Sequence, residues 1–104
     1  MGNTSFIGYV GEPDFHDGSV LTVEQTEDSV RVRVRGASGK TFVAEFTGVR
    51  DVRSSRPEGM LLYALSELRG QPPFRRFVFA NSDEQDEAAL EIDAERLRVY
   101  EDMV

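Results

Sequence analysis

Residues 30–47 read VRVRVRGASGKTFVAEFT, and this stretch decides the fold. Two segments in which apolar and polar residues alternate, the pattern of a half-buried β-strand, are separated by small turn residues. A three-residue loop ending at Gly39 places Val34 opposite Phe42 on one face, because side chains in a strand alternate with a period of two. The stretch therefore predicts an antiparallel hairpin with valines and phenylalanines inward and arginines outward.

The same alternation continues on both sides of this hairpin. Residues 19–26 predict a strand with Leu21 and Val23 on the inward face, and the polar residues 26–29 supply the even loop that this register requires. A three-stranded meander over residues 19–47 follows. Further strands are predicted at residues 5–10, 74–80, 88–94 and 96–100, with a tight turn at 93–95 between the last two.

Residues 55–58, SRPE, have the spacing of a capping box, in which the Ser55 and Glu58 side chains bond each other's backbone amides. Leucines recur at helical spacing at positions 61, 65 and 68, and Gly70 followed by two prolines would end a helix. These signals predict one short helix near residues 56–69. The alternative for residues 60–65 is a buried strand.

The predicted fold class is α+β, mainly β, as an antiparallel meander of six to eight short strands with the one helix. The strands would form a rolled sheet or a small sandwich. At 104 residues the chain would bury about 65% of its surface on folding, enough for one core, so residues 1–104 are expected to form a single domain.

Charge is unevenly distributed along the chain, whose net charge is -7. Residues 1–30 hold six acids and no Lys or Arg, residues 31–56 hold seven bases and two acids, and residues 57–104 hold five bases and eleven acids. The overall field repels phosphate, so we expect no nucleic-acid partner. The outward arginines are expected to pair with acids, for example Arg31 with Glu45 on the next strand.

Residues 36–41, GASGKT, end like a phosphate-binding loop. That loop requires a glycine at position 34, which is valine here, and a helix starting at the Lys-Thr pair, where this sequence alternates as a strand. The glycines are therefore assigned to a turn.

The only histidine lies in a turn with acidic neighbours, and Asp14, His16 and Asp17 are candidate binding residues. A carboxylate–histidine group can bind a metal or position a general base. A chain with one histidine and no cysteine is a poor source of metal ligands or nucleophiles, so no catalytic residue, metal or cofactor is assigned. The simpler interpretation is a turn in which Phe15 enters the core and His16 bonds nearby backbone.

A second candidate surface is the acidic linker at residues 81–87, which we expect to be solvated. Its candidate binding residues are Asp83, Glu84, Asp86 and Glu87. An acidic surface of this kind suits docking onto a basic protein.

Residues 15–18, FHDG, followed by alternating strands and by FTGV at 46–49, resemble the layout of small uncharacterised bacterial β-rich domains with a Phe-His-Asp-Gly turn. Some of these are assigned as immunity proteins of toxin systems. The resemblance covers residues 15–50. It implies a protein-binding role and no catalytic residues.

The expected function is a non-enzymatic domain that binds a protein, with a basic partner favoured by the acidic loops. The alternative is a small-ligand or metal-binding domain centred on the turn from Asp14 to Asp17. A homodimer through an uncovered edge strand is a further expectation. No apolar run is long enough to cross a membrane and the start lacks a signal-peptide layout, so the expected location is the cytoplasm.

Overall fold

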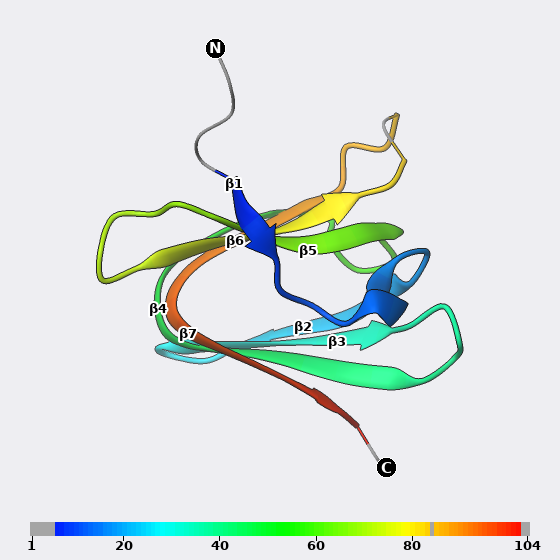
Figure 1. Ribbon diagram of the computed structural model, residues 1–104, viewed down its shortest axis with the longest axis horizontal. Helices are drawn as coiled ribbons and strands as arrows, with labels where there is room; N and C mark the ends of the chain where they lie inside the picture. Colours follow the sequence, from blue (N-terminus) through cyan, green and yellow to red (C-terminus); the bar gives the residue numbers. More distant parts are fainter. Residues whose placement is uncertain (1–5, 84, 103–104) are drawn as a thin grey trace.

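The computed structural model describes residues 6–83 and 85–102 and consists of one seven-stranded antiparallel sheet (Figure 1). In chain order the elements are β1 (Phe6–Tyr9), the single-turn 3-10 helix η1 (Pro13–Phe15), β2 (Ser19–Gln25), β3 (Ser29–Arg35), β4 (Thr41–Ser55), β5 (Leu62–Leu68), β6 (Arg75–Asn81) and β7 (Ala89–Glu101). The order across the sheet is β1-β5-β6-β7-β4-β3-β2. The mainly β, antiparallel prediction is confirmed.

The sheet is rolled because its two longest strands, β4 and β7, run side by side and bend together (Figure 1). At the bend Gly48 has a φ of 65°, and a Cβ there would lie 2.9 Å from the Cβ of Glu95. The register shifts between Val49 and Asp51, which marks a bulge in β4. Strands β1, β5 and β6 thus form one layer over β2 and β3.

The predicted separate strands at 88–94 and 96–100 are wrong in one respect, since they form the single strand β7. Residues 93–95 were expected to be a turn. The pairing with β4 continues on both sides of them, with Val49 opposite Ala94 and Thr47 opposite Arg96. Pairing with the long strand β4 therefore keeps β7 continuous through a bend at which the local turn residues had predicted a break between two strands.

The core lies between the two layers and contains the side chains that the sequence pattern turned inward. Phe46 is fully buried, and its ring centroid lies 5.2 Å from that of Phe77 and 5.9 Å from that of Phe79. Val34 faces Phe42 across the β3–β4 pair, as predicted. The register of the hairpin at 30–47 is confirmed along its whole length.

The meander over residues 19–47 is confirmed, with one correction in β2. A register shift lies between Val20 and Thr22, so Val20 is fully buried whereas Leu21 is only partly buried. The bulge changes the parity of the strand before Val23, which still packs against the core.

The helix predicted near residues 56–69 is absent from the structure, where residues 62–68 form β5 instead. Glu58 does not complete a capping box, because its carboxylate accepts a hydrogen bond from the backbone N–H of Val23, 3.2 Å away. Gly59 has a φ of 90°, a left-handed conformation that a helix cannot contain. The buried-strand alternative for this segment is the one that the structure adopts.

The start of β5 also joins the two ends of the roll. Ser19 in β2 bridges Leu61, the N–H of Val20 donates to the carbonyl of Met60 over 2.9 Å, and the N–H of Gly59 donates back to Val20 over 2.7 Å. These hydrogen bonds would be lost if residues 59–62 were helical.

No helix in the described part of the chain is long and apolar enough to cross a membrane.

Two of the three outward arginines of β3 pair with acids, as expected. Arg31 lies 2.9 Å from Glu45, and Arg33 lies 3.3 Å from Asp102. The glycine-lysine string is a turn, with Gly39 at a φ of 95° and Thr41 beginning β4. Thr41 therefore begins a strand at the position where a phosphate-binding loop requires a helix.

An ion-pair network crosses the outer surface of the bent strands. Arg53 lies 3.0 Å from both Glu91 and Asp93, and Arg76 lies 3.1 Å from Asp93. Partial burial alone would raise the pKa of the Asp93 carboxyl, but hydrogen bonds from Arg53 and Arg76 hold this pKa below its usual value. Asp93 therefore stabilises the fold in its ionised form.

We expect Asp93→Asn to lower the free energy of unfolding by about 1–2 kcal/mol at pH 7, because three charge-assisted hydrogen bonds, two from Arg53 and one from Arg76, are weakened. A carboxyl whose pKa is depressed by folding contributes above its unfolded pKa and loses this contribution as pH falls through the folded pKa. The difference between wild type and Asp93→Asn should therefore shrink below about pH 4. Urea unfolding at pH 7 down to pH 2 measures it, and parallel profiles would contradict the assignment.

Candidate functional site

A row of exposed aromatic rings crosses the outer side of β1 and β5. Phe6 contacts Tyr9 at a centroid distance of 5.1 Å, Tyr9 contacts Tyr63 at 6.3 Å, and Tyr63 contacts His16 at 5.2 Å, all edge to face. The exposed fractions of the first three are 43%, 62% and 48%. Exposed Ile7 and Leu61 extend the surface. Apolar side chains gathered in this way are typical of a binding surface.

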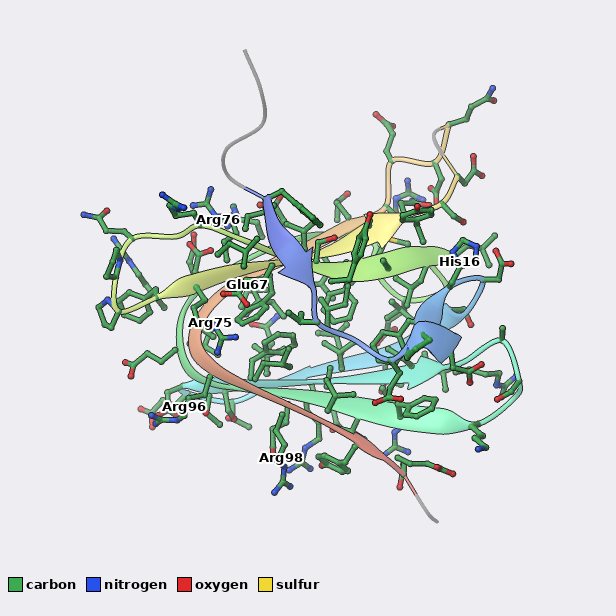
Figure 2. All side chains as sticks on the ribbon, in the orientation of Figure 1. His16, Glu67, Arg75, Arg76, Arg96 and Arg98 are labelled. Atoms are coloured by element: carbon green, nitrogen blue, oxygen red, sulfur yellow. The ribbon has the colours of Figure 1, made fainter. Side chains whose placement is uncertain are left out.

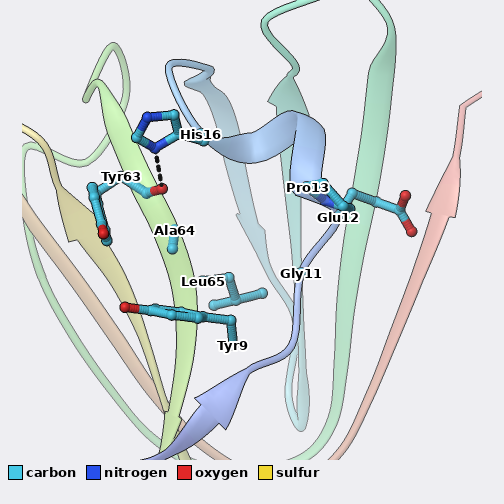
Figure 3. Close-up of a pocket in the computed structure, with 8 residues that line it drawn as sticks. All are labelled: Tyr9, Gly11, Glu12, Pro13, His16, Tyr63, Ala64 and Leu65. Carbon is cyan, nitrogen blue, oxygen red and sulfur yellow. Dashed lines mark hydrogen bonds between the residues drawn. The ribbon is translucent and has the colours of Figure 1, made fainter.

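A groove opens within this row because the N-terminal segment leaves the edge of β5 and returns to it. The N–H of Val10 donates to Leu65 and the N–H of Asp17 donates to Leu62, both over 2.9 Å, while the chain between them arches outward. The groove between them is open to solvent and has a volume of about 390 Å³ (Figure 3). We call it the aromatic groove; it is lined by Tyr9, Gly11, Glu12, Pro13, His16, Tyr63, Ala64 and Leu65.

The arch is held by the local sequence. Pro13 begins η1, where its fixed φ and missing N–H are tolerated, and the turn drives Phe15 into the core. The Phe15 ring lies 5.7 Å from that of Phe42, as the sequence interpretation expected of a core residue. Gly11 packs so closely on the Phe15 ring that a Cβ would lie 2.6 Å from it. The groove wall is therefore anchored to the core.

His16 closes one end of the aromatic groove. Its Nδ1 lies 3.1 Å from the carbonyl oxygen of Tyr63, which can only accept, so Nδ1 donates (Figure 3). In the neutral ring the Nε2 atom is then an acceptor, and it lies 3.9 Å from Oδ2 of Asp17. The expected backbone bond of His16 is present, although its partner is 47 residues away in the sequence.

Asp14 does not join His16. Its carboxylate accepts hydrogen bonds from the backbone N–H of Ser38 over 3.1 Å and from the Ser38 hydroxyl over 2.7 Å, and so fixes the β3–β4 turn. A Cβ on Gly36 would overlap this carboxylate. Within residues 6–83 and 85–102, no three His, Cys, Asp or Glu side chains converge on a possible metal position. The predicted cluster is thus divided between a structural aspartate and the His16–Asp17 pair.

The acidic linker also uses its carboxylates locally. Asp83 accepts a hydrogen bond from the N–H of Gln85, and Asp86 accepts one from the Asn81 amide and lies 3.8 Å from Arg56. Glu87 is exposed. Glu84 lies outside the described residues.

The two candidate regions of the sequence meet at the start of β5. The N–H of Asp17 donates to Leu62, and the N–H of Ser82 donates to the neighbouring carbonyl of Leu61 over 3.0 Å. The histidine turn and the acidic linker therefore flank Leu61 and Leu62, where β5 begins. Exposed Leu61 lies between them.

The lining of the aromatic groove carries little charge. Its eight lining residues include one acid and no Lys or Arg, although the Glu12 side chain points away from the Tyr9 ring (Figure 3). Figure 2 shows His16 at the opposite end of the molecule from Arg75, Arg76 and Arg96. These three arginines therefore lie far from His16.

The sequence interpretation missed Phe6, Tyr9, Leu61 and Tyr63. Strict alternation over residues 5–10 would place Phe6 and Tyr9 on opposite faces, and the register shift between Phe6 and Gly8 brings their rings together. Aromatic residues in a strand usually indicate core packing, and only the position of β1 at the edge of the sheet shows that these are exposed.

No protein-family model, curated protein or solved structure matches the chain.

Proposed function

We propose that this is a non-enzymatic domain that binds a basic protein partner through the aromatic groove and the exposed side chains beside it. The observation that carries the proposal is the exposed row from Phe6 to His16. Neutralisation of a basic toxin domain, the role implied by the immunity-type resemblance, is one function of this kind. The expected cytoplasmic location belongs to the same proposal.

The surface has the composition of a protein interface. Its centre consists of tyrosine and aliphatic side chains, which supply contact area at low entropic cost, and polar residues surround it. Asp17, which follows His16 in the turn, and the exposed Glu87 of the acidic linker would attract a basic partner and raise the association rate. In this proposal the apolar contacts supply the affinity, and these two acids favour a basic partner.

The local chemistry supports a binding role over catalysis. Asp14 is occupied by Ser38, and Nδ1 of His16 is occupied by the backbone of Tyr63. The side chain beside the other His16 nitrogen, Nε2, is the Asp17 carboxylate at 3.9 Å, which has no proton for a general base to remove.

The acidic charge also favours a different protein over a second copy. Each copy carries a net charge of -7, and like charges oppose the association of two copies. Sedimentation at two protein concentrations tests whether a second copy occupies the surface, and we expect a monomer at both concentrations. A concentration-dependent dimer that Tyr63→Ser abolishes would assign the surface to self-association and overturn the proposal.

The direct test uses fluorescein-labelled 12-residue peptides that differ only in having four arginines, four glutamines or four glutamates. Fluorescence anisotropy should detect binding of the arginine peptide alone. We expect Tyr63→Ser to weaken this binding about tenfold, in keeping with loss of a central aromatic contact.

The matched control is Tyr100→Ser, which removes a tyrosine that packs under Arg98 on β7, away from the groove. Its affinity should equal that of wild type. Circular dichroism confirms that both variants are folded. Equal affinity in wild type and Tyr63→Ser, or tighter binding of the glutamate peptide, would overturn the proposal.

A further inference from the structure

We propose that the aromatic groove recognises one arginine side chain of the partner, whose stem lies on Tyr63 and whose guanidinium bonds the His16–Asp17 pair. This inference rests on the proposed function and deepens it, because it names the side chain that the groove selects.

The first support is a pair of acceptors without a donor between them. With the His16 ring neutral and Nδ1 donating to Tyr63, Nε2 presents a lone pair, and the Asp17 carboxylate presents another 3.9 Å away. Two acceptors at this separation cannot bond each other. A cationic group with several N–H donors, placed beside both, would satisfy them together.

The backbone holds Asp17 in this position. Its φ of 67° is left-handed, and its N–H donates to Leu62 in β5. The side chain of Asp17 is 74% exposed and that of His16 is 59% exposed, so both acceptors are open to an incoming group. The pair is therefore fixed by the fold yet accessible to a partner.

The second support is the use of aromatic faces elsewhere in the protein. Three arginines stack on rings, with Arg50 at 5.3 Å from the Phe74 centroid, Arg75 at 5.0 Å from Phe77 and Arg98 at 4.6 Å from Tyr100. In the part of the chain that the structure describes, the rings of the groove carry no such cation. Tyr9 and Tyr63 are exposed, and no lysine or arginine lines the groove that they form.

Arginine fits these groups better than lysine does. Its planar guanidinium offers five donors in a fork, so it can bond a ring nitrogen and a carboxylate together while its stem covers an aromatic ring. A lysine ammonium is a compact and strongly hydrated charge that gains less from a half-exposed groove. The edge-to-face contact of Tyr63 with His16, at 5.2 Å, brings the surface for the stem next to the acceptors for the head.

The test uses the labelled peptide with its four arginines replaced, in separate probes, by four lysines or by four citrullines. Citrulline keeps the shape of arginine and loses its charge. We expect the arginine peptide to bind wild type about tenfold more tightly than the lysine peptide. Binding of the citrulline peptide should be weaker still.

Asp17→Asn and His16→Phe test the acceptor pair. Asparagine tolerates the left-handed backbone of Asp17, and phenylalanine keeps an aromatic ring beside Tyr63. Each variant should reduce the ratio of arginine to lysine affinity toward one. Glu27→Gln is the control, since it removes an equal charge from the exposed β2–β3 turn and should leave the ratio unchanged.

The outcomes separate this inference from the proposed function. Equal binding of arginine and lysine peptides, with Tyr63→Ser still weakening both, would overturn the arginine assignment and leave the protein-binding function standing. An unchanged ratio in both Asp17→Asn and His16→Phe would also overturn it. Failure of every basic peptide to bind would remove both.

Discussion

Replacing Phe46 by alanine should lower the free energy of unfolding by about 3–5 kcal/mol, a cost typical of removing a buried aromatic ring. Phe46 is fully buried on β4 and contacts Phe77 and Phe79 of β6, which lies in the other layer of the roll. Its ring therefore contacts side chains of both layers. Neither layer can fill the cavity that alanine leaves unless the bend of β4 and β7 moves. Urea unfolding followed by circular dichroism measures the change.

Two comparisons make this prediction specific. Phe46→Leu keeps most of the buried volume and should cost clearly less than Phe46→Ala. Phe6→Ala removes the same side chain from the exposed surface of β1 and should change stability by less than about 0.5 kcal/mol. A loss below 1 kcal/mol for Phe46→Ala would contradict the position of this ring between the layers.

The sequence allowed the meander over residues 19–47 to be predicted because its information is local. Loop length and alternation together fix the register of a hairpin, and a one-residue slip would expose Val34 and Phe42. Leu21 is the exception, since a bulge shifts the parity of β2 beside it. Nothing in the residues around Leu21 indicates the bulge, which forms where β2 also meets residues 59–61.

Residues 56–69 were assigned wrongly because their local signals agree with a helix while their partners are distant. Glu58 bonds Val23, and residues 59–61 bond β2. Leu62 and Leu65 are both buried although their spacing breaks strict alternation, because the register shifts between Leu62 and Ala64. A bulged strand thus imitates helical spacing, and tertiary pairing decides between the two.

The candidate site was predicted in part. His16 and Asp17 lie at the aromatic groove, whereas the partners of Asp14 and His16 lie in the β3–β4 turn and in β5. Their separation in sequence, 24 and 47 residues, places these contacts beyond any local pattern. The exposure of Tyr9 follows from the edge position of β1, which depends on the order of all seven strands.

We expect Arg75→Ala to destabilise the protein by about 2–4 kcal/mol, because it leaves the Glu67 carboxylate buried without its partner. Glu67 is only 7% exposed and lies opposite Phe77, on the inner side of the sheet. Arg75 donates two hydrogen bonds of 2.9 Å to it and covers the Phe77 ring at 5.0 Å (Figure 2). The hydrogen bonds to Glu67 raise the pKa of the Arg75 guanidinium and outweigh the opposing effect of burial.

A double-mutant cycle distinguishes this pair from simple packing. Glu67→Leu should cost less than Arg75→Ala, because the half-exposed guanidinium can turn to water whereas the buried carboxylate cannot. Adding Glu67→Leu to Arg75→Ala should recover part of the lost stability, since no unpaired charge then remains inside. Equal and additive losses in a urea-unfolding cycle would show that the two side chains act independently and would contradict this prediction.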